Sequence, residues 1–432
     1  MLSALAPRIV RIARGRLARN ALSLYAVQGL NFLLPLALLP YLLRVLSPEA
    51  YGSIVFAQAF MGYFIMLTDF GFNLTAARDI SVAREDPQKV ARIYWTTQAA
   101  KCALLLLAAV IVFVAVGAVP RLREDWTVFA ACSLLLLGSS FFPTWYFQGL
   151  ERLRDTAIIQ VLAKCLVTAA IFVFVRTPRD TVLAAVFMSS PQLIGLLAAL
   201  ALGYPAKPAT FYRPSLAEIR AALRGSFDMF LSTVSSSLYL YTNTFVLGLM
   251  AGARPVAFYS VGNRLVSAML SLTSPVTQAV YPRASLLFAS DRPRAWQLVR
   301  RVSWLLLPAI GAVALLTAIF APLIVRILAG PSYGAASLVT RIMAPIPVLV
   351  TAASLLAQTI MVNLGLARYL WRIYLMVGLM NLAILPVLVH LFVADGAAAA
   401  LTIAEALGPI LMICALRRHE NPWTSALPSG PA

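Results

Sequence analysis

Polar residues in the segment 260–278 recur at a spacing that places them on one side of a helix. They are separated by steps of four, three, four, three and four positions, and they are Ser260, Arg264, Ser267, Ser271, Ser274 and Gln278. These steps follow the helical repeat of about 3.6 residues, so the side chains share one face. An arginine among hydroxyls and an amide can hold an anionic group such as a phosphate through charge-assisted hydrogen bonds. A polar helix–helix interface is the alternative, because serines also allow close packing.

Three other apolar segments carry polar residues at the same helical spacing. The sets are Gln28, Asn31 and Pro35; Gln58, Gly62 and Asp69; and Ser232, Ser236, Tyr239 and Asn243. Asn263 directly precedes Arg264. Amides, serine hydroxyls and tyrosines donate and accept hydrogen bonds, so a polar stripe along a span faces a cavity or a partner helix rather than lipid. We therefore expect these stripes to line a central cavity and to bind a substrate there.

Charged residues inside apolar segments form a second group of candidates. A charge at the centre of a membrane span costs at least about 2.5–3.5 kcal/mol, so it is a functional hypothesis by default. The cations in this position, besides the one at 264, are Lys101, Lys164 and Arg341. Long basic side chains can instead extend to the membrane surface, and this alternative stays open for all of them. Asp69 and Glu405 are acids that could pair with a cation or carry a coupling proton or ion.

The elements that position these residues are apolar helices. Hydrophobic residues make up 61% of the 432 residues and charged residues only 12%, against about 25% charged in a soluble domain. Backbone in lipid must satisfy its own hydrogen bonds, and long apolar runs do so as helices. We therefore predict an all-α integral membrane protein. Its twelve transmembrane helices are expected over 22–43, 53–77, 93–118, 126–149, 156–175, 181–203, 227–250, 257–282, 303–329, 335–362, 369–393 and 396–416.

A hydrophilic stretch at 204–226 divides these spans into six and six. The segment 46–60 can be laid on 253–267, which indicates a repeat whose halves have the same orientation. The fold prediction is therefore two six-helix bundles around a central cavity. Its parts are a basic amphipathic segment at 1–21, an N-terminal bundle at 22–203, a cytoplasmic linker at 204–226, a C-terminal bundle at 227–416 and a cytoplasmic tail at 417–432.

The net charge of +19 is first a guide to the membrane topology, and only then to a binding partner. Most lysines and arginines fall in the loops on one side of the predicted spans, the side that also holds both termini. Cytoplasmic loops are enriched in basic residues, so both termini are predicted to be cytoplasmic. The basic excess therefore does not indicate a nucleic-acid partner.

Several kinds of chemistry find no support in the sequence. It contains no GxxxxGK[ST] loop, has only two histidines, and shows no cysteine spacing of a metal site. We expect no cofactor, no bound metal and no catalytic residue. No loop is long enough for a separate soluble domain, which argues against a membrane glycosyltransferase or polymerase.

Five segments, in order along the chain, resemble the bacterial O-antigen and polysaccharide flippases of the Wzx type. They are the stretch 23–60 (SLYAVQGLNFLLPLALLPYLLRVLSPEAYGSIVFAQAF), DFGFNLTAARDIS at 69–81, FFPTWYFQGLERLRDTA at 141–157, SPVTQAVYPRAS at 274–285 and AGPSYGAAS at 329–337. The sequence departs from the family pattern at LSPEAYG, where relatives usually read L-G-x-x-x-F/Y-G.

The resemblance implies membership of the polysaccharide transporter family of the multidrug/oligosaccharidyl-lipid/polysaccharide (MOP) exporter superfamily. It implies a flippase that moves an undecaprenyl-pyrophosphate-linked oligosaccharide between the leaflets of the bacterial inner membrane. Arg264 lies where relatives often carry a basic residue, which implies a role in holding the diphosphate. Membrane lipids, a polysaccharide polymerase and chain-length machinery are the implied partners.

A cation-coupled drug antiporter of the same superfamily is the main alternative function. Such a protein is expected to carry acidic residues in its cavity, whereas the interior charges of this chain are mostly basic. The sequence does not specify the glycan or the coupling ion.

Overall fold

The computed structural model describes residue 34, residues 37–201, residue 208 and residues 210–419, without the side chains at 232, 235–240 and 419. These ranges are helical with short connections and contain no strand, which confirms the prediction of an all-α protein. The helices are α2 (Pro48–Asp69), α3 (Phe72–Val82), α4 (Pro87–Ala118), α5 (Pro120–Glu124), α6 (Trp126–Cys132), α7 (Leu134–Phe141), α8 (Thr144–Gly149), α9 (Leu153–Phe174), α10 (Thr181–Ser189), α11 (Pro191–Ala201), α12 (Leu216–Ala251), α13 (Ala253–Ser290), α14 (Arg292–Ile319), α15 (Ala321–Ala329), α16 (Ala336–Met343), α17 (Ile346–Ser354) and α18 (Ala367–His419). A π-helical segment, Leu355–Met361, follows α17.

Contacts divide the chain into two compact units. Unit 1 comprises residues 1–45 and 61–231, and unit 2 comprises residues 46–60 and 232–432. The first part of α2 therefore belongs to unit 2, although the sequence prediction placed residues 46–60 in the N-terminal bundle. The stretch predicted as a linker is helical from Leu216 onward, and this first part of α12 belongs to unit 1.

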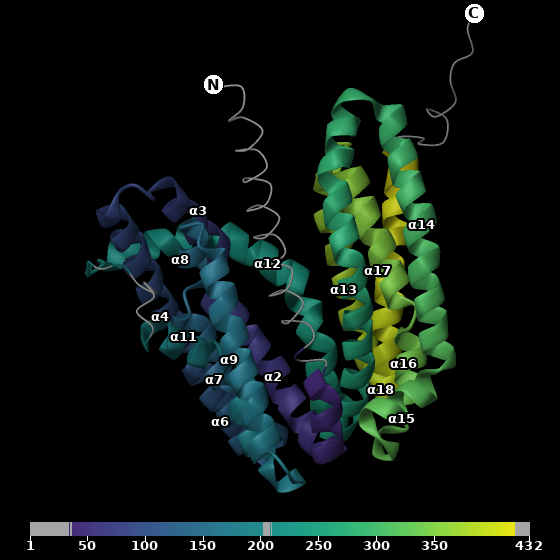
Figure 1. Cartoon of the computed structure of the whole chain (residues 1–432), viewed down its shortest axis with the longest axis horizontal. Coiled ribbons are helices and arrows are strands. Elements are labelled where there is room, and N and C mark those ends of the chain that lie inside the picture. Colours follow the sequence, from purple (N-terminus) through teal and green to yellow (C-terminus); the bar gives the residue numbers. More distant parts are fainter. Residues whose placement is uncertain (1–33, 35–36, 202–207, 209, 420–432) are drawn as a thin grey trace, which may run out of the picture. The chain divides into compact units, whose positions relative to one another are not determined.

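Unit 1 is built around an aromatic core. In it α3 packs against α4 and α8, α11 packs against α7 and α9, and α10 packs against α6 and α9 (Figure 1). Trp145 of α8 is completely buried, and its ring centroid is 5.3 Å from that of Tyr94 on α4. The motif around Pro143 and Trp145 thus places its large side chains inside the helix bundle.

Unit 2 is a bundle in which α13 is central. It contacts α14, α16, α17 and α18, and α17 also packs against α14 and α18 (Figure 1). The start of α2 joins this bundle, because a Cβ atom on Gly52 would collide with the carbonyl group of Ala253. Glu49 lies 3.4 Å from the guanidinium of Arg254. The two segments that the sequence aligns as a repeat, 46–60 and 253–267, therefore pack directly on each other.

Two sharp backbone turns divide long helical stretches. Phe70 and Gly71 have φ values of 46° and 78° between α2 and α3. Within α18, Val393 has φ of 53°, and a Cβ atom on Gly396 would collide with the carbonyl group of Leu388. Glycine is suited to both a left-handed backbone and a close approach. The turn at Val393 falls at the boundary that the sequence predicts between spans 369–393 and 396–416.

Apolar helices long enough to cross a membrane are found in both units. Seven described helices meet this standard of length and composition, and the bent pair Pro178–Ser189 and Pro191–Ala201 would make an eighth. The helices α12 and α13 are not among them, although the sequence predicts spans at 227–250 and 257–282. The 52-residue stretch Ala367–Arg418 counts as one and covers two predicted spans. A multi-spanning membrane protein is supported, while twelve spans with cytoplasmic termini stay a prediction.

Candidate functional site

A buried ion pair lies at the end of α2 in unit 1. The Nζ atom of Lys101 is 3.7 Å from Oδ1 of Asp69, and the lysine side chain is only 2% exposed. Asp69 is the last residue of α2 and also accepts a hydrogen bond from the side chain of Asn73. The structure thus brings together a cation predicted to bind substrate and an acid predicted to couple transport to an ion.

Lys101 also forms a hydrogen bond to the backbone where the helix is interrupted between α7 and α8. Pro143 has no N–H group, so the carbonyl of Ser139 loses its helical donor. Lys101 donates a hydrogen bond to this carbonyl at 3.1 Å. Gln98, one turn earlier on α4, donates to the carbonyl of Ser140 at 3.2 Å. These bonds satisfy backbone groups that would otherwise be exposed inside an apolar bundle, where water cannot replace them.

The polar stripe of α13 in unit 2 has a buried part and an exposed part. Ser260 is buried and donates to the carbonyl of Ala257. Arg264, Ser267 and Gln278 are exposed. The guanidinium of Arg264 has no hydrogen bond or ion pair with any residue that the structure describes. The exposed part therefore presents a cation and an amide away from the core of unit 2.

A cluster of uncharged polar groups lies inside unit 2. Asn381 Nδ2 donates to Asn243 Oδ1 at 3.0 Å, and both side chains are 1% exposed. Tyr259 is also buried and hydrogen-bonds to Asn243. Glu405 is half-buried and interacts electrostatically with Tyr259. Asn243, predicted on a cavity-lining stripe, is thus inside the bundle, and the predicted coupling acid Glu405 borders the cluster.

The side chain of Arg341, a residue of α16, reaches the end of α14. Its Nε atom donates to the carbonyl of Ala318 at 3.1 Å. Pro322 lacks the N–H group that would have reached this carbonyl, so the arginine fills a gap that a proline creates. The side chain is exposed. Lys101 in unit 1 and Arg341 in unit 2 therefore make the same kind of contact. In each case a cation on one helix donates a hydrogen bond to a carbonyl that a proline leaves without its helical donor.

The remaining predicted residues are placed as follows. Lys164 is half-buried on α9, Gln58 is half-buried on α2, and Asn263 is half-buried on α13. The backbone carbonyl of Asn263 accepts a hydrogen bond from Ser267. Gln28, Asn31 and the side chain of Tyr239 lie outside the described residues. No single site inside either unit contains all the predicted residues that the structure describes.

Comparisons with known proteins place the chain in a family. Residues 17–288 match the family described as "Polysaccharide biosynthesis protein". A protein of Escherichia coli (strain K12) named "Putative O-antigen transporter" is 31% identical over 408 residues, which cover 94% of this chain and 97% of that protein. The chain belongs to the polysaccharide biosynthesis protein family. A Shigella dysenteriae protein of the same name is 27% identical, covering 92% of this chain and all of that protein.

The fold of this polysaccharide biosynthesis protein is shared with solved exporters. An inward-facing multidrug resistance MATE family transporter of the MOP superfamily matches with a TM-score of 0.70 at 15% identity, covering 91% of this chain and 96% of that chain. The lipid II flippase MurJ in an inward closed conformation matches with a TM-score of 0.67 at 11% identity, covering 92% and 87%. The predicted resemblance to polysaccharide transporters is therefore confirmed at the level of the family, and the solved structures show that the fold is shared with a MATE transporter and with MurJ.

Sequence reasoning missed three polar residues of this polysaccharide biosynthesis protein. Gln98, Asn73 and Asn381 are each hydrogen-bonded to a predicted residue or to the same helix break. A signal for Gln98 was present, because it lies three positions before Lys101 on the same helix face. Asn381 is an amide in a predicted span, which also marks it as a residue that needs a partner.

A second group of charges ties α4 to the start of α12 in unit 1. Glu218 accepts a hydrogen bond from the backbone N–H of Ser215 at 2.7 Å, from the hydroxyl of Tyr212 at 2.7 Å and from Arg92 at 2.6 Å. The Ser215 N–H, the Tyr212 and Ser215 hydroxyls and then Arg92 lower the pKa of Glu218 to about 2. The carboxylate therefore stays ionised at any physiological pH.

Metal binding has no support in the described part of the chain. Among those residues, no group of three or more histidine, cysteine, aspartate or glutamate side chains could hold a metal ion.

Proposed function

We propose that this protein is a flippase for an undecaprenyl-diphosphate-linked oligosaccharide, an O-antigen or exopolysaccharide repeat. It carries the lipid-linked unit from the cytoplasmic to the periplasmic leaflet of the bacterial inner membrane by alternating access. One observation carries the substrate class: the chain matches two proteins named as O-antigen transporters over 94% and 92% of its length.

The exposed face of α13 supports a diphosphate as the group that is bound. Arg264 offers a planar guanidinium that can donate two parallel hydrogen bonds to a phosphate. Ser267 and Gln278 add uncharged hydrogen-bonding groups on the same face. No acidic residue occurs between Ser260 and Gln278. A transporter of cationic drugs would need acids on such a face, so this composition favours an anionic substrate.

The pair formed by Asp69 and Lys101 supports a role in coupling. Asp69 directly precedes the left-handed turn at Phe70 and Gly71, where the backbone can change direction. Hinge motion requires interactions that differ between two states. We assign Asp69 as the acid whose contact with Lys101 changes during transport, and Glu405 as the corresponding acid of unit 2.

The function is tested by deleting the gene and analysing lipid-linked oligosaccharides. A flippase predicts that complete units accumulate on the cytoplasmic face of the membrane and that a plasmid copy restores their delivery to the periplasm. If the units themselves were missing, the protein would act in their synthesis. If delivery were normal and only drug resistance were lost, the antiporter would replace the flippase.

A further inference from the structure

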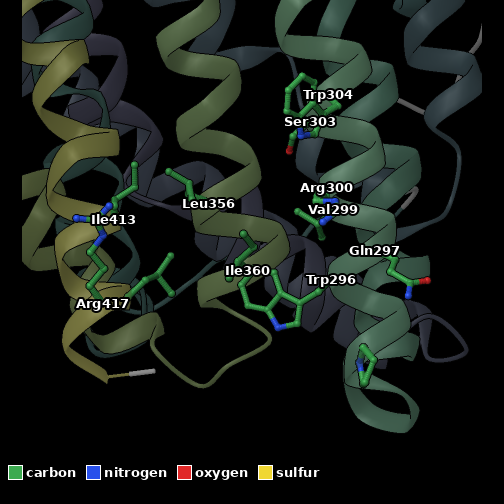
Figure 2. A pocket seen from close by; sticks show the side chains of 12 residues that line it. Trp296, Gln297, Val299, Arg300, Ser303, Trp304, Leu356, Ile360, Ile413 and Arg417 are labelled. Atoms are coloured by element: carbon green, nitrogen blue, oxygen red, sulfur yellow. The ribbon is translucent and has the colours of Figure 1, made fainter. Parts of the chain in front are cut away.

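A cleft of about 510 Å³ opens on unit 2 between α14, the π-helical segment after α17 and the end of α18. Figure 2 shows the cleft and its lining side chains. None of the residues that line it belongs to α13. The cleft is therefore separate from the face that carries Arg264, and what binds there can be argued independently of the proposed transport function.

The cleft has two cations and no acid. Arg300 of α14 and Arg417 of α18 stand on opposite walls (Figure 2). Both side chains are exposed, and neither forms an ion pair with a residue in the described part of the chain. An arginine on each side of the cleft favours an anionic ligand, and the planar donor geometry of a guanidinium suits a phosphate.

The rest of the lining is apolar and aromatic. Trp296 is fixed by edge-to-face packing on Phe288, with ring centroids 5.7 Å apart. Trp304 is 74% exposed and lies two turns further along α14. Leu356 comes from the π-helical segment and Ile413 from α18. Tryptophan is enriched where one end of a side chain meets hydrocarbon and the other meets polar head groups.

We propose that this cleft binds an anionic glycerophospholipid of the surrounding bilayer. Its phosphate lies between Arg300 and Arg417, and its acyl chains run along Trp304, Leu356 and Ile413. The position fits this occupant, because arginines are frequent in the first part of α14 and two of them stand near the end of α18. Basic pockets between membrane helices recognise lipid phosphates in this way. A bilayer lipid supplies both the anion and the hydrocarbon that the two parts of the cleft match, whereas inorganic phosphate supplies only the anion.

The test uses native mass spectrometry of the delipidated full-length protein with added phosphatidylglycerol. The variant R300Q/R417Q removes both cations from the cleft. The control R301Q/R418Q removes the adjacent arginines, which are exposed but do not line it. We expect R300Q/R417Q to bind phosphatidylglycerol at least about tenfold more weakly, since hydrogen bonds to charged groups are lost. The control should match the wild type, and phosphatidylethanolamine should bind all three proteins equally weakly.

A second variant, Ser303→Phe, fills the cleft and leaves every charge in place. It should also lose the tightly bound phosphatidylglycerol while unfolding at the wild-type temperature. Equal losses in R300Q/R417Q and R301Q/R418Q would overturn the proposal, because general surface charge would then hold the lipid. Displacement of phosphatidylglycerol by inorganic phosphate alone would overturn it in favour of a free-phosphate site. Displacement by a lower concentration of a polyprenyl diphosphate would overturn it in favour of a substrate site.

Discussion

Lys101 in unit 1 and Arg264 in unit 2 are cations in the middle of long helices, yet the protein accommodates them in opposite ways. Lys101 is 2% exposed, lies 3.7 Å from Asp69 and donates to the carbonyl of Ser139. Arg264 is exposed and has no partner among the residues that the structure describes. The ammonium group of Lys101 is paired with groups of the protein itself, whereas the guanidinium of Arg264 is exposed and without such a partner among the described residues.

The difference comes from neighbouring elements rather than from the helices that carry the two cations. Pro143 frees a carbonyl beside α4, and the turn after α2 brings a carboxylate to the same point. On α13 the hydroxyl of Ser267 bonds to the carbonyl of Asn263 on its own helix, and no acid in the described part of the chain pairs with Arg264. Of these two cations in predicted spans, the candidate ligand group is therefore Arg264, which faces neither a proline break nor an acid among the described residues.

Removing the ammonium group of Lys101 should cause the largest loss of stability. In Lys101→Met the carboxylate of Asp69 and the carbonyl of Ser139 both lose a donor inside the bundle. Removing one partner of a buried ion pair costs roughly 3–5 kcal/mol. We expect a clearly lower midpoint of thermal unfolding for the purified protein in detergent, and a lower abundance in the membrane.

The matched control for this change is the double variant K101M/D69L. It removes both charges, so it should recover a substantial part of the stability lost in Lys101→Met. If Lys101→Met alone unfolded at the wild-type temperature, Lys101 would not be a structural cation and the contrast with Arg264 would be wrong.

Removing the guanidinium of Arg264 should affect transport and leave stability unchanged. Hydrogen bonds to a charged ligand are lost in Arg264→Ala, so delivery of lipid-linked units should fall by about tenfold or more. Arg264→Lys should retain only part of the activity, because an ammonium group cannot donate the paired bonds of a guanidinium. Periplasmic units are measured against protein abundance in membranes.

Arg283→Ala provides the control for the loss of a charge from α13. Arg283 is exposed on the same helix but lies outside the polar stripe. Its substitution should leave delivery at the wild-type level. Normal delivery by Arg264→Ala would show that the exposed cation does not hold the substrate.

The fold class and the family could be predicted from the sequence, because apolar length and ordered motifs are local properties. The positions of the cations could not. Lys101 and Arg264 both lie within apolar runs. Only the packing of α7 against α4 and the position of Asp69 at the end of α2 show that one of them is paired. The helix limits also differ, since α14 begins at Arg292 although its span was predicted from 303. Polar ends that continue a helix beyond the hydrocarbon carry no hydropathy signal.

Removing the amide of Gln98 should have a smaller effect than removing Lys101. Gln98→Leu leaves the carbonyl of Ser140 without its donor, and an unsatisfied buried group costs about 1–3 kcal/mol. Thermal unfolding should place this variant between the wild type and Lys101→Met. A loss as large as that of Lys101→Met would mean that the freed carbonyls, and not the ion pair with Asp69, dominate the stability of this region.

The smallest expected effect concerns Glu218, which is half-buried and paired with an exposed arginine, Arg92. Its pKa is lowered from an ordinary value of 4.5 to about 2, so its contribution to stability is fully present above pH 4.5 and is lost as the pH falls toward 2. We expect the unfolding temperatures of the wild type and Glu218→Gln to differ by a constant, small amount from pH 6 to 8. That difference should shrink progressively below pH 4.5, as thermal unfolding at a series of pH values would show. A difference that grew on acidification would mean that Ser215, Tyr212 and Arg92 do not hold Glu218 ionised. The pair of Arg92 and Glu218 would then differ from the buried pair of Lys101 and Asp69 in more than its exposure to solvent.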